Sequence, residues 1–189
     1  MRPEVLPGRP ECPEPARWLA RDSEATEHDV SMLIGAFVWA LKPDYVIETG
    51  TYRGDTTVMI GQALQALGRG HLVSIDIDPQ ATLFTAERLN GQGLPVTLMT
   101  CKASSFIPSE PVDLIFIDCS LDDRFQQVQA FRPYASPRCV ILMHDSALPA
   151  SGPGVAQLYA DAQKMVDYSL VYPWVKLPTP RGLAISRYR

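Results

Sequence analysis

The hydrophobic residues of this 189-residue chain fall into two alternating patterns. Between residues 30 and 41, apolar side chains recur at helical spacing; Ser23 or Thr26 can cap the helix that they predict, and Pro43 ends it. Short runs rich in β-branched residues then alternate with segments of helical period. These patterns predict strands over 44–49, 71–76, 95–100, 112–118 and 138–144, and helices over 55–67, 79–90, 122–134 and 154–166.

The order of these elements predicts the fold class. Strands that alternate with helices form a parallel sheet with both faces covered. Two final strands, 168–175 and 182–188, follow each other without a helix, so they must pair antiparallel. We therefore predict an α/β fold: a Rossmann-like, doubly wound, mostly parallel sheet of seven strands with an antiparallel strand near the carboxyl end.

The start of the chain differs from the rest. Its first 17 residues contain five prolines, which makes a regular element there unlikely and indicates an arm or a flap. We predict a Pro-rich arm over residues 1–22 and a single domain over residues 23–189.

Composition and charge narrow the class of protein. The chain is 46% hydrophobic and 20% charged, which is typical of a globular protein, and its formal net charge of −4 disfavours nucleic acid as a main partner. Four widely separated cysteines without a C-x-x-C pair predict neither a zinc site nor a disulfide framework. The start of the chain lacks an apolar signal segment, and the uncharged stretch 30–41 is too short to span a bilayer. We expect a cytoplasmic protein with no membrane partner.

A glycine-containing turn follows the first strand of the alternating series. Gly50 and Gly54 have the spacing G-x-x-x-G, which differs from the G-x-G-x-x-G of nicotinamide-binding domains. Gly50 permits a tight turn, and Gly54 would let the next helix begin close to a ligand. Glu48 adds a carboxylate suited to a cationic or amine-bearing ligand. Because ligands of open α/β sheets bind at the carboxyl ends of the strands, this turn predicts a ligand site.

The next strand ends on a second carboxylate, that of Asp76. An acid in this place can accept hydrogen bonds from both hydroxyls of a ribose, which predicts a nucleoside without fixing the cofactor. Asp78, before Pro79, is equally typical of a helix N-cap.

Four motifs in register resemble those of the class I S-adenosylmethionine-dependent O-methyltransferases, of the catechol O-methyltransferase type. They are E-x-G-x-Y-x-G-x-T at 48–56, S-I-D-I-D-P at 74–79, A-S at 103–104 and D-L-I-F-I-D at 113–118. The resemblance covers roughly residues 26–145. It implies the class I methyltransferase fold, including the reversed strand, and S-adenosylmethionine (SAM) as cofactor.

The resemblance also implies where the cofactor lies. The methionine part would be surrounded by Glu48, Gly50, Tyr52 and Thr56, the ribose held by Asp76, and the adenine flanked by Ser104. Lys102 departs from the family pattern, which places an acid near the adenine amine. The full predicted cofactor set is Glu48, Gly50, Thr51, Tyr52, Gly54, Thr56, Asp76, Ile77, Ala103, Ser104 and Asp118.

Asp118 and Asp145 each end an apolar strand, and in the family's strand order these two strands are neighbours about 4.8 Å apart. Two such carboxylates repel each other unless a proton or a cation lies between them, and oxygen ligands suit Mg²⁺. The resemblance implies that both acids hold Mg²⁺, although Ser146 stands where the family has an Asn ligand. The alternative is a metal-free arrangement in which Asp118 faces the sulfonium and Asp145 caps a turn.

The candidates for catalysis are Asp118, His144 and Asp145. An acceptor hydroxyl loses its proton either to a base such as His144 or Asp145, or because a metal lowers its pKa. A lone histidine is also typical of a structural residue. The family's catalytic lysine, expected just after Asp118, is missing, since residues 119–124 read C-S-L-D-D-R.

These features predict a SAM-dependent methyltransferase acting on the oxygen of a small hydroxylated acceptor, with a divalent metal as an open question. The Asn/Asp-Pro-Pro-aromatic signature of amino-group methyltransferases is absent after residue 117. The alternatives are a SAM-binding domain that is non-catalytic or depends on a partner, and a nicotinamide oxidoreductase. The loops at 119–123 and 146–153 would form the acceptor rim, and the helix 30–41 and the last strand offer surfaces for a homodimer.

Overall fold

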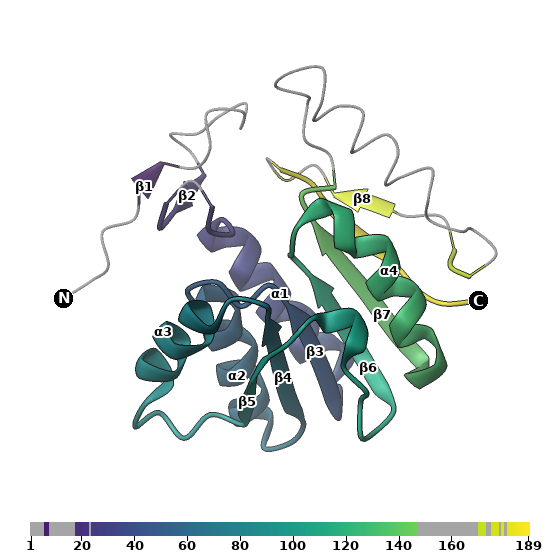
Figure 1. Cartoon of the computed structure of the whole chain (residues 1–189), viewed down its shortest axis with the longest axis horizontal. Helices are drawn as coiled ribbons and strands as arrows, with labels where there is room; N and C mark the ends of the chain where they lie inside the picture. Colours follow the sequence, from purple (N-terminus) through teal and green to yellow (C-terminus); the bar gives the residue numbers. More distant parts are fainter. Residues whose placement is uncertain are drawn as a thin grey trace.

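The computed structural model describes residues 6–7, 18–22, 24–146, 170–172, 175–177, 179 and 181–189 (Figure 1). The predicted helix 154–166 lies outside these residues. In chain order the described elements are β1 (Leu6–Pro7), β2 (Leu19–Ala20), α1 (His28–Leu41), β3 (Tyr45–Thr49), α2 (Asp55–Leu67), β4 (His71–Asp76), α3 (Pro79–Leu89), β5 (Val96–Thr100), the 3-10 helix η1 (Ala103–Ser105), β6 (Val112–Ile117), α4 (Leu121–Phe131), the 3-10 helix η2 (Arg132–Tyr134), β7 (Ala135–His144), β8 (Val175–Leu177) and β9 (Leu183–Ser186).

Seven of these strands form one sheet in the order β5-β4-β3-β6-β7-β9-β8. The first five strands of this order are parallel, whereas β9 pairs antiparallel with both β7 and β8. The chain runs outward from β3 to β4 and β5, then returns to β6 on the other side of β3. This reversal opens a crevice beside β3, where open α/β sheets bind ligands. The predicted α/β class and the single reversed strand near the carboxyl end are confirmed.

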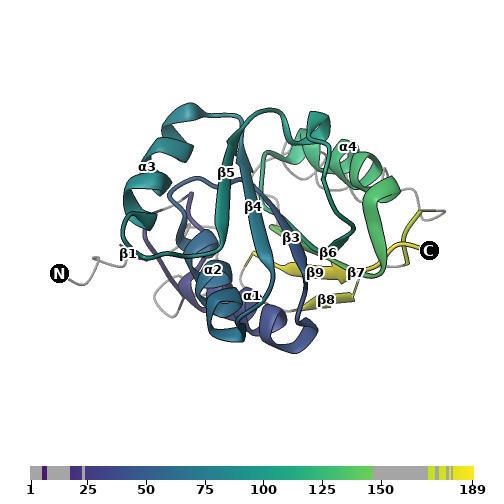
Figure 2. The ribbon, with the colours of Figure 1, turned by 90° about the horizontal axis from the view of Figure 1, so that it is seen from below.

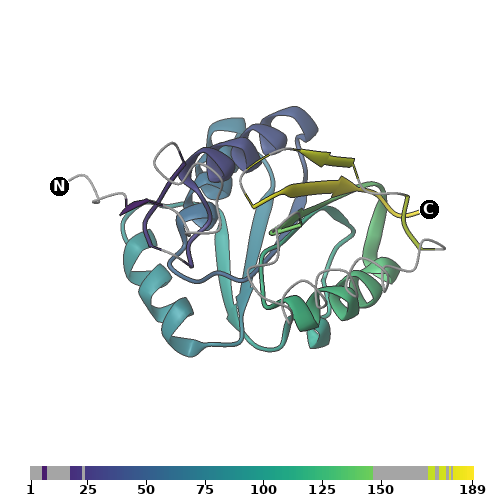
Figure 3. The same cartoon turned by 90° about the horizontal axis from the view of Figure 1, so that it is seen from above.

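Two hydrophobic clusters, one on each face, hold the helices to the sheet. Ile34 and Val38 of α1 pack with Ile60 and Leu64 of α2 on one face, and Val128 and Phe131 of α4 lie in the cluster on the other. Figures 2 and 3 show α1 and α2 together on one side and α4 on the opposite side. The central strands β3 and β6 are buried along their whole length, which explains why their sequences are nearly continuous apolar runs. None of the helices among the described residues is long and apolar enough to cross a bilayer.

Several element boundaries differ from the sequence prediction. The two final strands were predicted over 168–175 and 182–188, whereas among the described residues β8 covers Val175–Leu177 and β9 covers Leu183–Ser186. Helix α1 has Glu27 at its N-cap rather than Ser23 or Thr26, and no side chain caps it, because the Glu27 carboxylate is used elsewhere. Helix α4 changes to the 3-10 helix η2 near Pro133, which lacks the N–H that an α-helix needs. Strand β7 begins at Ala135, three residues early, because a bulge in its pairing with β6 lets it continue. The predicted cap at Asp78 is confirmed, since its side chain accepts the N–H of Gln80.

The start of the chain also differs from its prediction. Where no regular element was expected, β1 pairs antiparallel with β2 over two residues on each side. Pro7 is tolerated there because an edge strand does not need every backbone N–H. The division into an arm, 1–22, and a domain, 23–189, stays a prediction.

The two glycines of the turn after β3 are required by neighbouring parts of the protein. Gly50 has a φ of +89°, and a Cβ atom on it would lie 2.1 Å from the carbonyl oxygen of Asp118. Gly54 has a φ of +73°, and its Cβ would lie 2.5 Å from Cγ2 of Thr85 on α3. Gly50 therefore allows the ends of β3 and β6 to meet. Gly54 makes room for helix α3, a role different from the ligand approach expected for it.

We expect Gly50→Ala to destabilise the fold far more than Gly68→Ala. Gly68 also has a positive φ, of +66°, but a Cβ there would meet nothing within 4 Å. Its replacement should cost about 1 kcal/mol of the free energy of unfolding, from backbone strain alone, whereas that of Gly50 should exceed about 3 kcal/mol because it adds a clash with backbone. Urea denaturation of both variants measures the difference, and equal losses would contradict the close approach of β3 to β6.

Candidate active site

A cleft of about 570 Å³ opens at the carboxyl ends of the parallel strands, beside the switch point next to β3. Its wall contains residues at the ends of all five parallel strands, β3 to β7, together with the first turns of α4. The lining residues are Glu24, Thr49, Gly50, Tyr52, Ile75, Asp76, Ile77, Cys101, Lys102, Ala103, Asp118, Cys119, Ser120, Asp123, Arg124, Gln127, Asp145 and Arg181. Of the segment 119–123, predicted as a loop at the acceptor rim, Cys119 and Ser120 precede α4 and Asp123 lies in its first turn, and all three line the cleft.

Asp76 lies at the end of β4 and faces this cleft with its carboxylate fixed in place. Its Oδ2 accepts the backbone N–H of Tyr52 at 2.9 Å, and its Oδ1 accepts that of Asp78 at 2.9 Å. Each oxygen still has a lone pair for a further donor. Ile77, next to it, has 70% of its surface exposed and adds an apolar patch to the cleft wall. An acid beside an apolar patch suits the ribose and the base of a nucleoside.

A smaller recess of about 40 Å³ shares Gly50, Tyr52 and Asp118 with the cleft. Its lining includes the four residues that the sequence placed around the methionine part of the cofactor: Glu48, Gly50, Tyr52 and Thr56, and also Thr51. The Glu48 carboxylate accepts hydrogen bonds from the hydroxyls of Thr57 and Ser74, both at 2.6 Å. Burial raises the pKa of Glu48 to about 7, although these two hydrogen bonds lower it.

Two members of the predicted cofactor set lie outside both linings. Gly54 faces Thr85, as described above. Ser104 belongs to η1 and is half-buried, while its neighbours Lys102 and Ala103 line the cleft. The ε-amino group of Lys102 lies 3.5 Å from Oδ1 of Asp123, so its charge is turned toward α4.

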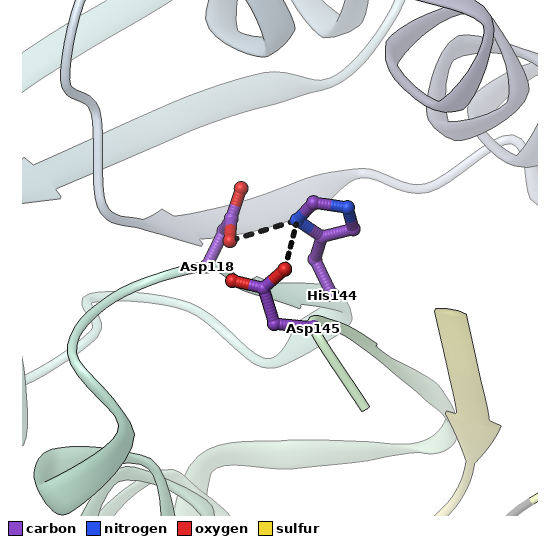
Figure 4. Close-up of side chains that lie close together, drawn as sticks. All are labelled: Asp118, His144 and Asp145. Atoms are coloured by element: carbon purple, nitrogen blue, oxygen red, sulfur yellow. Dashed lines mark hydrogen bonds and ion pairs between the residues drawn. The ribbon is translucent and has the colours of Figure 1, made fainter. Parts of the chain in front are cut away.

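The three residues predicted to carry catalysis come together below the cleft (Figure 4). Asp118 follows β6, and His144 and Asp145 stand at the end of β7. The Nδ1 atom of His144 lies 3.1 Å from Oδ1 of Asp118 and 3.6 Å from Oδ1 of Asp145. Figure 4 shows both carboxylates directed at the same ring nitrogen. Their proximity, predicted from neighbouring strands, follows from the parallel pairing of β6 with β7.

Three further charged residues complete this arrangement, and sequence reasoning assigned no role to any of them. Glu27, at the start of α1, accepts the Nε2–H of His144 at 2.9 Å. Arg181, just before β9, donates from Nη2 to Oδ2 of Asp145 at 2.8 Å, and its Nε lies 2.5 Å from Oδ1. Arg124 of α4 places Nη2 3.7 Å from Oδ1 of Asp118 and 3.6 Å from Oδ2 of Asp145. We call the six residues Glu27, Asp118, Arg124, His144, Asp145 and Arg181 the charge cluster.

The charge cluster is nearly closed to solvent. The side chains of Glu27 and His144 are fully buried, and that of Asp118, the most exposed of the six, has 13% of its surface exposed. Buried charges persist only when they are paired. Three carboxylates are balanced by two guanidinium groups and, when protonated, one imidazole.

The protonation states of His144 and Asp118 follow from this balance of charges. Burial on its own would lower the pKa of His144, but the charges of Asp118 and Asp145, with the hydrogen bonds to Asp118 and Glu27, raise it to about 10. Burial would raise the pKa of Asp118, but the His144 cation and the two guanidinium groups hold it well below its usual range. At neutral pH His144 is therefore a cation with its proton already bound. It also does not line the cleft, so the arrangement disfavours the general base expected of it.

A divalent metal would need free ligand atoms on these three residues. Asp118, His144 and Asp145 each offer one ligand atom, and these atoms lie within 4.8 Å of one another. However, Arg181 contacts both oxygens of Asp145, and Arg124 is close to both acids. A protonated imidazole cannot bind a metal, and its cationic charge repels one. In this arrangement the residues do not fit Mg²⁺, and a metal at Asp118 and Asp145 stays a prediction that the charge balance disfavours.

The residues missed in the sequence left weak signals. Arg124 stands six residues after Asp118, inside the segment where the family's lysine was sought. Glu27 directly follows Thr26, one of the two predicted caps, where an acid is typical of the first turn of a helix. Arg181 gave no signal, because an arginine in a Pro-rich turn is normally exposed and only the tertiary structure pairs it with Asp145.

Comparison with known proteins identifies the family. A family model described as "Methyltransferase domain" matches residues 47–146, which include the glycine turn, Asp76, Asp118 and Asp145. The chain belongs to this methyltransferase family. The nicotinamide oxidoreductase considered as an alternative is thereby set aside. No curated protein matches the chain.

Solved structures share the fold at low sequence identity. An O-methyltransferase from Bacillus cereus, in complex with S-adenosylhomocysteine (SAH), has a TM-score of 0.70 at 14% identity, over 89% of this chain and 84% of that one. The O-methyltransferase TomG from Streptomyces achromogenes, in complex with SAM, has a TM-score of 0.68 at 16% identity, over 87% of this chain and 82% of that one. The SAH-bound methyltransferase PaMTH1 from Podospora anserina has a TM-score of 0.70 at 17% identity, over 94% of this chain and 82% of that one. The class I methyltransferase fold is thus shared with proteins of this kind.

We predict that His144 makes stability depend on pH. Because the pKa of His144 is raised, the folded state keeps a proton between pH 6.5 and about 10 that the unfolded state has lost. The contribution of this proton to the free energy of unfolding is fully present below pH 6.5 and decreases as the pH rises toward 10. The loss should approach roughly 1 kcal/mol per pH unit. The raised pKa of Glu48 also makes the free energy of unfolding decrease with rising pH, but only between its usual pKa of 4.5 and about pH 7.

The measurement is urea denaturation at several values between about pH 7.5 and about pH 9.5. His144→Gln should flatten the slope, while His28→Gln, which changes an exposed imidazole, should leave it as in the wild type. The same slope in all three proteins would contradict a buried His144 cation.

Proposed function

We propose that this protein binds SAM in the cleft and transfers its methyl group to the oxygen of a small hydroxylated molecule. The observation that carries the proposal is Asp76, fixed at the end of β4 by two backbone N–H groups and facing a cleft at the switch point. The SAM- and SAH-bound structures that share the fold support the cofactor, and the O-methyltransferases among them support an oxygen acceptor.

The two cavities divide the proposed cofactor between them. The adenosine would lie in the cleft, with its ribose on Asp76 and its base against Ile77. The methionine end would enter the recess, where Glu48 offers a carboxylate to its ammonium group. Asp118 lines both cavities, so its carboxylate would lie near the sulfonium. A permanently ionised acid suits a cationic sulfur.

The chemistry required is a displacement at the methyl carbon. The acceptor oxygen must lie about 3 Å from that carbon, opposite the sulfur, which is chiefly a matter of positioning. The acceptor would enter past Cys119, Ser120 and Asp123, the residues of the predicted rim that line the cleft. A homodimer and a cytoplasmic location stay predictions. Met32 and Trp39 on α1 are 53% and 50% exposed, and a second copy could cover them.

We expect Asp76→Asn to weaken SAM binding roughly 100-fold, because the neutral side chain loses charge-assisted hydrogen bonds to two ribose hydroxyls. Asp78→Asn is the matched control: it changes a nearby exposed acid whose capping role asparagine also fills. Isothermal titration with SAM and with SAH measures both affinities. An unchanged affinity in Asp76→Asn would contradict the assigned ribose site.

The activity is tested separately from binding. Purified protein is incubated with methyl-labelled SAM and panels of phenols, catechols and matched amines, and transfer of the label to oxygen is expected. Tighter binding of NAD than of SAM would contradict the proposal. Tight SAM binding without transfer to any acceptor would favour the non-catalytic or partner-dependent SAM-binding domain.

A further inference from the structure

We propose that the guanidinium group of Arg181, assisted by Arg124, stands in the place of a divalent cation, so that this chain transfers methyl groups without a metal. This inference deepens the proposed function and rests on it. It starts from a disagreement between two features of the site: the acids that imply Mg²⁺ are present, yet their charges are already neutralised by arginine.

Arg181 occupies the position between Asp145 and the start of α1. It donates to Asp145 Oδ2 from Nη2 and to the carbonyl oxygen of Ala25 from Nη1 at 3.0 Å, and its Nε lies 3.7 Å from Oε1 of Glu27. Its side chain has only 3% of its surface exposed, on the cleft wall. A metal on Asp145 would have to displace this group from its closest carboxylate. Breaking a buried ion pair in this way is strongly destabilising, because it leaves buried charge uncompensated.

Arg124 provides the second cation close to the two acids. Its Nε and Nη2 donate to the carbonyl oxygen of Cys119 at 2.9 and 2.7 Å, and Nη1 donates to that of His144. These bonds fix the guanidinium between the ends of β6 and β7, with Asp118 and Asp145 both within 3.7 Å. A fixed positive charge therefore lies near the position where the missing lysine was expected.

The third metal ligand supports the same conclusion. The serine at position 146 is buried at the end of β7, where an amide oxygen was expected. A hydroxyl is a poorer ligand for Mg²⁺ than an amide oxygen. The missing lysine and the serine at 146 are thus consistent with the two arginines: the ligand set is weak where Arg124 and Arg181 supply permanent cations.

The chemical role follows from the position of the two cations on the cleft wall. A positive charge with N–H donors stabilises an acceptor oxygen in its ionised form, so it lowers the pKa of a phenolic hydroxyl as a metal would. The hydroxyl loses its proton to water. The oxygen then forms a bond to the methyl carbon while the bond between that carbon and sulfur breaks. The electron pair of the broken bond stays on sulfur, which gives SAH. A guanidinium keeps its charge throughout.

The site itself is tested by Mn²⁺ uptake, which is measured as the loss of the electron paramagnetic resonance signal of the free ion. The wild-type chain, with and without SAH, should leave the signal unchanged at millimolar Mn²⁺. Arg181→Gln, which frees Asp145, should take up one ion. Arg187→Gln is the matched control, since Arg187 is exposed at the opposite end of β9 and donates to Pro137; it should behave as the wild type.

Two results would overturn the proposal. One is stoichiometric Mn²⁺ uptake by the wild type that Asp145→Asn removes. The other is exclusion of Mn²⁺ by both the wild type and a folded Arg181→Gln, because the guanidinium would then not be what keeps the ion out. A thermal melt shows whether Arg181→Gln folds; if it does not, Arg124→Gln takes its place in the same comparison.

Activity provides the second readout. Methyl transfer by the wild type should be unchanged by EDTA, and Arg181→Gln should lower turnover roughly 100-fold, with Arg181→Lys in between because it keeps the charge. Activity that EDTA abolishes and Mg²⁺ restores would also overturn the inference. Failure to bind SAM would contradict the proposed function, whereas Mn²⁺ uptake by the wild type would contradict only this inference.

Discussion

The pairing of buried charges beneath the cleft is the interaction on which the site depends. The charge cluster joins the start of α1, the end of β6, the first turns of α4, the end of β7 and the start of β9. Each member lies where an unpaired charge would be costly, so the five segments hold one another at fixed distances. Part of the cleft wall is built on these segments, and the shape of that part therefore depends on buried ion pairs as well as on the hydrophobic clusters of the sheet.

This constraint also separates two tasks that the cleft must perform. Asp76, at the end of β4, is held by two backbone N–H groups, and Glu48, on β3, is held by the hydroxyls of Thr57 and Ser74. The proposed cofactor would lie along these two acids. The guanidinium groups of Arg124 and Arg181 lie on the β7 side, where an acceptor would approach. Asp118 stands between the two regions and belongs to both cavities. An anion-binding side opposite a cation-binding side suits a reaction between an oxyanion and a sulfonium.

Most of the fold could be predicted because its signals are local. Helix α2 and strand β4 begin and end where hydrophobic period, glycine and proline indicated. The extension of β7 to Ala135 and the pairing of β1 with β2 depended on a bulge and on a distant strand, which no local pattern records. Gly54 illustrates the same limit: its left-handed φ could be suspected from the turn, but the contact with Thr85 of α3 could not.

For the site, the sequence alone determined the identities and strand-end positions of Glu48, Gly50, Asp76, Asp118 and Asp145, because a parallel sheet brings the carboxyl ends of its strands to one edge. The protonation and partners of these residues were decided only by the tertiary structure. Arg181 is 36 residues from Asp145 and Glu27 is 117 residues from His144. Whether an acid faces a metal, a proton or a guanidinium depends on which distant charge is buried beside it, and that information lies in the packing of the elements.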